Sequence, residues 1–267
     1  MSENTCRITI LGCGDSAGVP RIGGDWGACD PANPRNRRTR ASVMVQSDMT
    51  TLVVDTGPDF CTQLTREGIQ KVDAVLYTHA HSDHVAGMDD LKVLSAKAGG
   101  KIPIYTDAVT VKELQRRFGY LFEQKSEFYP AVVESRIFDE SSMGQSQRIG
   151  DIDVIPFIQD HGQGNRSLGF RFGDVGYSTD MRGLDEAALS VLKGVRVWIA
   201  DCADYSRGHG TLHATLPIVQ QLNSVIGAPQ VYLTHLKVFD DYERMSADLP
   251  TGYAPAYDGM LVDYVKK

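Results

Sequence analysis

Several features that mark other protein classes are missing from this sequence. It has no long uninterrupted apolar run, no C-x-x-C pair and no excess of basic residues. Without an apolar stretch of about 18 residues we expect no membrane-spanning helix. The first residues carry no basic segment followed by an apolar run, so we expect no signal peptide. The five cysteines, an odd number, argue against a disulfide framework and favour reduced thiols in the cytoplasm.

The charge balance narrows the choice of partners. The net charge of −7 disfavours extended nucleic acid, which usually meets a basic protein face. A small anionic substrate is compatible with this net charge, because bound metal ions can dominate the local field of a site. A homodimer is also open, since nothing in the composition selects an oligomeric state.

The secondary-structure pattern predicts strands and helices along the whole chain. We expect strands at 6–11, 42–46, 51–54, 74–77, 102–105, 136–139, 152–157, 168–172, 176–178, 195–200 and 230–233. We expect helices at 58–67, 91–97, 108–118, 185–193 and 216–225, with Asp107 and Thr215 as N-caps. Two sheets packed face to face with helices outside would bury these elements. The predicted fold is therefore an α+β four-layer αββα sandwich, with residues 1–267 as one domain.

Two segments interrupt this pattern. Residues 12–40 contain so many glycines and prolines that regular structure is excluded, and a loop of this length is usually functional or disordered. Residues 119–146 are predicted to be an irregular, elaborated segment that could serve as a lid or a dimer contact.

The stretch 79–84, HAHSDH, carries the clearest chemical signal. It gathers three histidines and one aspartate directly after an apolar strand, in a chain with seven histidines. Imidazole and carboxylate are ligands that suit zinc, manganese or iron. Alternate residues after a strand end, here His79 and His81, can converge on one ion, and the following turn can aim Asp83 and His84 at a second. An exposed polar turn is the alternative, but it does not explain the clustering.

This motif resembles the H-x-H-x-D-H signature of the metallo-β-lactamase superfamily, and other parts of the chain match in order. His161 follows the strand at 152–157, Asp180 follows Gly176–Thr179, and His235 ends the strand at 231–234. Asp55, in VVDTG, resembles the aspartate that supports the metal loop. The resemblance covers nearly the whole chain.

The resemblance implies two divalent ions per chain, zinc or manganese, with iron as a third choice. The first ion would be held by His79, His81 and His161, and the second by Asp83, His84 and His235, with Asp180 bridging both. Two ions held in this way can share a hydroxide nucleophile.

The carboxylates and the first loop favour phosphodiester chemistry. The superfamily's true β-lactamases typically lack a bridging aspartate, so Asp180 argues against that activity. Two metal-binding carboxylates suit phosphoryl transfer, in which charge is stabilised on both attacking and leaving oxygens. Residues 12–20, GCGDSAGVP, resemble the opening of tRNA 3′-processing nucleases and of phosphoribosyl 1,2-cyclic phosphodiesterases.

Two histidines outside the ligand set are candidates for proton transfer. Both phosphodiesterase branches carry a non-ligand histidine at a place that matches His213, so the resemblance implies that His213 protonates the leaving oxygen. Histidine suits this role because its unperturbed pKa lies near neutrality. His209 is the nearby rival for this role and is also a candidate substrate contact. Asp83 would orient the nucleophile.

The first loop also departs from the cyclic phosphodiesterase pattern. That family typically has a structural zinc held by cysteines of this loop and by a histidine after the last metal ligand. Here only Cys29 remains, and a structural zinc needs about four ligands, so we expect none. Ser16 and Arg38 are candidate substrate contacts, the latter because its fork of donors matches phosphate oxygens; a solvated loop explains the arginine equally well.

The leading prediction is a dinuclear metal-dependent phosphodiesterase for a small cyclic or nucleotide-like phosphate ester. The alternatives are a tRNA 3′-processing type of nuclease, a thioesterase or lactamase-like acyl hydrolase, and a non-catalytic binding protein. A nuclease would need a basic surface for tRNA, and an acyl hydrolase would leave His213 without a role.

Overall fold

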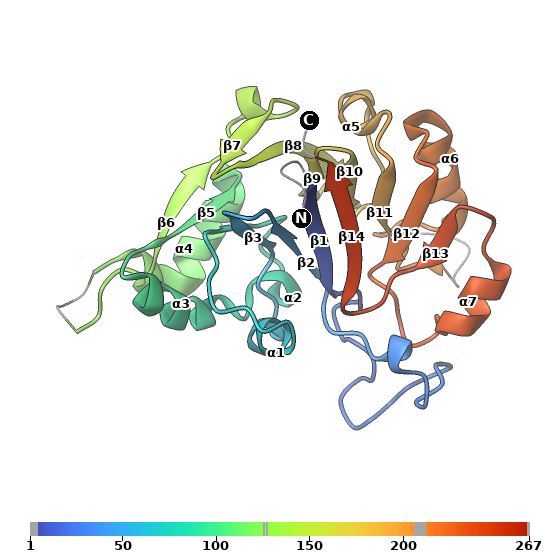
Figure 1. Cartoon of the computed structure of the whole chain (residues 1–267), viewed down its shortest axis with the longest axis horizontal. Coiled ribbons are helices and arrows are strands. Elements are labelled where there is room, and N and C mark those ends of the chain that lie inside the picture. The colour runs from blue at the N-terminus through green and yellow to red at the C-terminus, as the bar shows by residue number, and fades with distance from the viewer. Residues whose placement is uncertain (1–4, 125, 127, 206–211, 266–267) are drawn as a thin grey trace.

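Two seven-stranded sheets form the centre of the molecule in the computed structural model, which describes residues 5–124, 126, 128–205 and 212–265 (Figure 1). The first sheet has the order β14 (Met260–Val265), β1 (Thr5–Gly12), β2 (Ser42–Gln46), β3 (Thr51–Val54), β4 (Ala74–Leu76), β5 (Ile102–Thr106), β6 (Val133–Ile137). The second has the order β13 (Tyr253–Pro255), β12 (Gln230–Thr234), β11 (Val197–Asp201), β10 (Val175–Ser178), β9 (Arg166–Phe172), β8 (Ile152–Asp160), β7 (Gln147–Ile149).

Side chains alternate between two apolar layers along the central strands. In β2, Val43 and Val45 pack between the sheets, whereas Met44 packs against the outer helices. In β11, Ile199 packs between the sheets and Trp198 packs outward. This alternation follows from the two-residue period of a strand. Both faces of each sheet are therefore buried, which explains why the strands read as nearly continuous apolar runs.

Helices cover the outer face of each sheet (Figure 1). The first sheet packs against α1 (Phe60–Arg66), α2 (Ser82–Val85), η2 (Met88–Asp90), α3 (Leu91–Ala98) and α4 (Ala108–Phe122). The second packs against α5 (Glu186–Leu192), α6 (Leu216–Ile226) and α7 (Tyr242–Asp248). The shorter elements η1 (Pro34–Asn36) and η3 (Glu140–Ser142) lie in connections. The predicted four-layer αββα sandwich is confirmed.

The structure corrects several predicted boundaries. Helix α4 continues to Phe122, and β6 begins at Val133, so part of the segment 119–146 is regular rather than irregular. The reason is packing: Leu121 and Val133 are both buried in the apolar layer beside the first sheet. Strands β7, β13 and β14 and helix α7 were not predicted. Thr215 stands at the N-cap of α6 but makes no capping hydrogen bond with its side chain, whereas Asp107 accepts a bond from the Thr110 amide.

The long loop between β1 and β2 is tied to the segment after β12. Asp241 accepts hydrogen bonds from the Asp30 amide at 3.1 Å and from the Asn36 side chain at 2.7 Å. Val19, Cys29 and Val238 form a small apolar cluster of their own. The loop is therefore ordered by contacts with α7 and with the residues just before this helix, although it has almost no regular structure.

Among the described residues, no helix has the length and apolar character needed to span a bilayer.

Candidate metal centre

The candidate residues lie just beyond the carboxyl ends of strands. Strands β3 and β4 run parallel, as do β10, β11 and β12, and β8 shares the direction of β10 because both are antiparallel to β9. The residues that follow these ends are Asp55 after β3, His79 after β4, His161 after β8, Asp180 after β10 and His235 after β12. Side chains far apart in sequence therefore meet at one edge, which is where sheets of this type place ligands.

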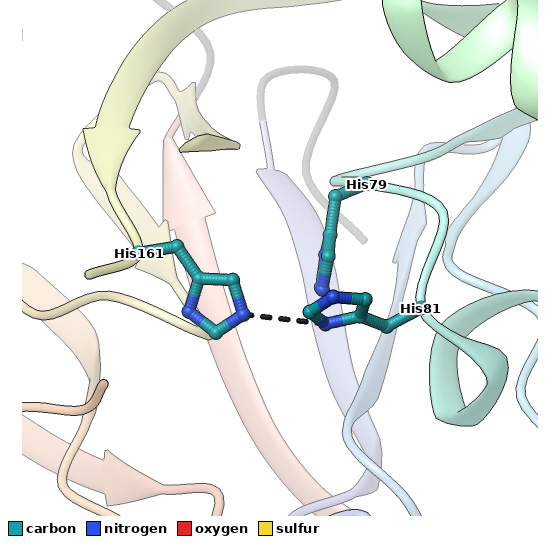
Figure 2. A group of neighbouring side chains, drawn as sticks. All are labelled: His79, His81 and His161. Carbon is teal, nitrogen blue, oxygen red and sulfur yellow. Dashed lines mark hydrogen bonds between the residues drawn. The ribbon is translucent and has the colours of Figure 1, made fainter. Parts of the chain in front are cut away.

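The first group of ligand atoms contains His79, His81 and His161. One nitrogen of each ring lies within 4.8 Å of the others. Figure 2 shows the three rings turned toward one another, two from the loop after β4 and one from the end of β8. His161 Nε2 and His81 Nδ1 are 3.3 Å apart. Three imidazoles facing one point are a typical set of protein ligands for a divalent ion.

The second group contains Asp83, His84, Asp180 and His235, again with ligand atoms within 4.8 Å. His84 Nε2 lies 2.5 Å from Asp180 Oδ2 and 3.3 Å from Asp83 Oδ2. His235 Nε2 lies 3.6 Å from Asp180 Oδ2. The other carboxylate oxygen of Asp180 is 3.6 Å from His161 Nε2. Asp180 thus faces both groups, as a bridging carboxylate would.

Asp55 supports the metal loop, residues 78–84, which carries four of the candidate ligands. Its carboxylate accepts hydrogen bonds from the Thr78 amide and hydroxyl, both at 2.9 Å, and lies 2.7 Å from His84 Nδ1. Since the carboxylate accepts, Nδ1 of His84 carries the proton and Nε2 remains for a metal. Outer partners of this kind set the tautomer and orientation of ligand histidines.

Strained backbone marks the same positions. Of four described non-glycine residues with positive φ, three are Asp55 (65°), Asp180 (48°) and His235 (62°). The left-handed conformation costs roughly 1–2 kcal/mol per residue. Such strain persists only where the surrounding structure enforces it, and it concentrates at functional sites.

Buried atoms without partners test whether these residues fit metal ions. His79 Nε2 and His235 Nε2 are buried and have no hydrogen-bond partner. Leaving such atoms unpaired costs about 1–3 kcal/mol each, so at most a few are tolerated without compensation. Nitrogen and carboxylate donors facing one point suit divalent ions. The residues fit the metal group that the sequence resemblance implies.

The electrostatics of the centre point the same way. Burial lowers the pKa of His79 well below its usual value, so this ring is neutral and able to bind a metal. For His235, the nearby carboxylates of Asp180 and Asp83 outweigh burial and raise the pKa to about 9. The pKa of His84 is likewise raised, against burial, by Asp180 and Asp55. The buried carboxylates therefore stabilise positive charge beside them. Without metal ions, protons on His84 and His235 provide that charge.

His213 lies beside this centre and is oriented by Asp201. Its Nδ1 is 2.9 Å from Asp201 Oδ2 and 3.6 Å from Asp180 Oδ1. The Asp201 carboxylate also accepts bonds from the Met181 and Ala203 amides. Despite burial, Asp201 raises the pKa of His213. His213, Asp201 and Asp180 form a further potential ligand group with His235, but Asp201 already accepts hydrogen bonds within the protein.

Asp201 was missed by the sequence reasoning. It ends β11, between the strands that end before Asp180 and His235, so its position beside two candidate ligands was a usable signal.

The three substrate-contact candidates have different outcomes. Ser16 is exposed, and its carbonyl accepts a bond from Arg40 at 3.3 Å. Arg38 is 1% exposed and donates to the Lys237 carbonyl at 3.2 Å, so it packs the loop against the segment after β12. This burial disfavours the predicted phosphate contact. His209 lies outside the described residues.

Comparisons with known proteins place the chain in a family. Residues 50–236 match the family model described as the β-lactamase superfamily domain. The chain is similar to a solved diphosphatase of the PhnP family, with 32% identity, coverage of 97% of both chains and a TM-score of 0.87. It is 28% identical to an octanoyltransferase of Porphyromonas gingivalis over 95% of its own length and 51% of that protein. It is also 28% identical to ribonuclease Z of Methanopyrus kandleri over 49% of its length and 43% of the nuclease.

The fold is the metallo-β-lactamase fold, and two groups of potential metal ligands lie at one edge of its sheets. The chain belongs to the β-lactamase superfamily. It spans about half the length of the curated relatives it matches.

Proposed function

We propose that this chain is a phosphodiesterase that uses two divalent ions to hydrolyse a small cyclic or nucleotide-like phosphodiester. The observation that carries the proposal is the position of Asp180. Its carboxylate faces both ligand groups and lies 3.6 Å from His213, a histidine held by Asp201. This combines a shared metal site with a proton donor that need not be a ligand.

The protein residues have distinct tasks in this proposal. When bound, the ions stabilise negative charge on phosphoryl oxygens and make water a better nucleophile. Asp83 is half-buried at the second ligand group, and its pKa is well below the usual value despite burial, because the His235 and His84 rings lie beside its carboxylate. It is therefore ionised and can accept a hydrogen bond that orients the attacking water. His213 donates its Nδ1 proton to the Asp201 carboxylate, and its Nε2 remains for the leaving oxygen.

The relatives support this choice over other hydrolyses. The PhnP-family diphosphatase and ribonuclease Z both act on phosphate esters or anhydrides by their names. The 32% identity to the diphosphatase extends over 97% of the chain. These names say nothing of which phosphoester this chain hydrolyses.

Hydrolysis of bis(p-nitrophenyl) phosphate by protein reconstituted with zinc or manganese tests the proposal. We expect turnover, and we expect Asp83→Asn to reduce it by about 100-fold, since disturbing a metal shell commonly costs 10–100-fold. Asp89→Asn is the matched control, because this carboxylate pairs with Lys92 on the surface. Fully loaded protein without any turnover would refute the phosphodiesterase proposal.

One observation favours acyl hydrolysis as a second candidate. The octanoyltransferase relative aligns with 95% of this chain. If the resemblance reflects a shared substrate, the loaded protein will hydrolyse p-nitrophenyl octanoate faster than bis(p-nitrophenyl) phosphate. The reverse preference would leave phosphodiester hydrolysis as the better description.

A further inference from the structure

Within the first ligand group, the side chain of His81 is held least firmly by its surroundings. His79 is buried, and its Nδ1 lies 3.0 Å from the Thr78 hydroxyl. His161 is buried as well. The His81 ring is exposed and faces the other two rings, as Figure 2 shows. Packing does little to fix this ring, so its direction depends on the backbone that carries it.

The backbone of the metal loop is fixed on either side of residues 79–80. Before them, the Thr78 carbonyl accepts a hydrogen bond from the Leu168 amide at 2.8 Å. After them, the His81 carbonyl accepts from the His84 amide at 3.1 Å, where α2 begins. Among the residues that the structure describes, positions 79–80 take part in no backbone–backbone hydrogen bond. The peptide units just before His81 therefore depend on a side chain for support.

Arg117 on α4 provides this support. Its guanidinium donates to the Ala80 carbonyl, and its Nε lies 3.3 Å from Glu113 Oε1, one turn earlier on the helix. Arginine can hold both partners at once because it carries several donors in a planar fork. The Ala80 carbonyl belongs to the same planar peptide unit as the His81 amide. A bond that holds this oxygen therefore restricts the backbone at His81 and directs its Cα–Cβ bond.

Helix α4 is a firm base for the guanidinium. Asp107 caps its start by accepting from the Thr110 amide at 2.7 Å. The other oxygen of Asp107 lies 3.6 Å from Arg166 Nε at the start of β9. Leu114 is buried in the apolar layer against the first sheet. Groups carried by helices are positioned more precisely than groups on loops, so Arg117 can transfer the rigidity of α4 to the metal loop.

We propose that Arg117 is a positioning residue for the ion held by the first ligand group, and that it acts through the Ala80 carbonyl on the direction of His81. Removing an outer partner of a ligand residue commonly weakens metal binding by about 10–100-fold. This inference rests on metal binding by the first ligand group and not on which ester the protein hydrolyses.

The charge of Arg117, taken alone, would have the opposite effect. A guanidinium near a divalent cation repels it, so removal of the guanidinium would tighten metal binding if charge were its only contribution. Positioning has the reverse sign, because a displaced His81 weakens the binding of its ion. The direction of the change in affinity therefore separates the two roles.

Metal titration of Arg117→Gln measures this direction. Competition with a chromophoric chelator gives the zinc affinities of the protein, and proton–cadmium-113 correlation spectra of the cadmium-loaded protein identify the histidines bound to each ion. We expect the ion bound by His79 to be held about 10–100-fold more weakly and its correlation with His81 to weaken or vanish. The affinity for the other ion should change by less than about threefold.

Arg116→Gln is the matched control. Arg116 is the neighbouring residue on α4 and pairs with the same Glu113 at 2.5 Å, and among the described residues it has no hydrogen bond to the metal loop. Its loss should leave both metal affinities as in the parent. The melting temperature of the metal-free proteins checks that the variants fold. If Arg117→Gln does not fold, Arg117→Lys replaces it: lysine keeps the charge without the fork, and the first ion should still weaken by about threefold or more.

The possible outcomes separate positioning from a general contribution to the fold. Selective weakening of the first ion, with both affinities unchanged in Arg116→Gln, would support the proposal. Tighter or unchanged binding of that ion would overturn it. An equal loss for both ions would also overturn it, as would the same loss in Arg116→Gln, because neither result requires the bond to Ala80.

Discussion

At the scale of single residues, the pair His213 and Asp201 carries the most specific chemistry. Asp201 accepts hydrogen bonds from two backbone amides and still lies 2.9 Å from His213 Nδ1. Such a carboxylate holds its histidine in one tautomer and favours the imidazolium form. A histidine in this state can protonate a leaving oxygen, and the need for that proton depends on the leaving group.

This dependence gives a prediction for His213→Gln. With 2′,3′-cyclic adenosine monophosphate, whose leaving group is an alkoxide, kcat should fall by about 10²–10⁴-fold. With bis(p-nitrophenyl) phosphate the loss should be much smaller, because p-nitrophenolate leaves without a proton. Steady-state kinetics on both substrates provide the measurement.

Metal content and a second variant serve as controls for this prediction. Bound metal, measured by elemental analysis, should not change in His213→Gln; loss of an ion would identify His213 as a ligand instead. Asp201→Asn should reduce turnover of the cyclic substrate and alter its pH profile, since an amide can favour the wrong tautomer of His213. Equal losses on both substrates would contradict a proton-donor role.

At the scale of elements, the loop between β1 and β2 depends on a cap of α7. Asp241 begins α7 by accepting a bond from the Arg244 amide, and it also accepts from Asp30 and Asn36 of the loop. Although burial opposes it, these hydrogen bonds lower the pKa of Asp241. One carboxylate thus joins a helix start to a loop that has little other regular structure.

The lowered pKa predicts how this contact responds to acid. A carboxylate whose folded pKa lies below its unfolded value of about 3.9 stabilises the protein above that value, and the contribution disappears as pH falls through the folded pKa. The stability difference between the parent and Asp241→Asn should therefore be full at pH 6 and shrink below about pH 4. Urea unfolding between pH 6 and 3 will measure it. A difference that stays constant across this range would argue against an ionic contribution.

At the scale of the whole molecule, the metal centre joins the two sheets. His79, His81, Asp83 and His84 come from the first sheet's connections, whereas His161, Asp180 and His235 follow strands of the second. Any ion that binds both sets cross-links the two halves of the sandwich. The buried Nε2 atoms of His79 and His235 have no hydrogen-bond partner in the protein.

Removing metal should consequently lower the stability of the entire fold. Binding to the folded state alone contributes about 2.7 kcal/mol at a free metal concentration 100 times Kd, and about 2–4 °C of melting temperature accompany each kcal/mol in a protein of this size. We expect chelation to lower the melting temperature by about 5–10 °C, and zinc or manganese to restore it. Scanning calorimetry with and without chelator is the measurement; an unchanged transition would mean that these residues do not bind metal in the folded protein.

Much of this organisation was predictable from local patterns. The central strands and the helices at 91–97 and 185–193 follow from apolar periodicity and cap residues, because these signals act within a few residues. Strands β13 and β14 were missed even though Met260, Val262 and Tyr264 alternate inward, since short strands near a chain end resemble loops. The extension of α4 depends on burial of Leu121, which only its packing partner decides.

The sequence by itself determined the superfamily and the set of candidate ligands, because HAHSDH and the strand-ending aspartates and histidine are local patterns. Only the tertiary structure decided which groups those residues form, that Asp201 orients His213, and that Arg38 is buried while Arg166 approaches α4. The physical reason is that these relations join segments tens to hundreds of residues apart. Their distances arise from how two sheets pack, and no local pattern encodes that packing.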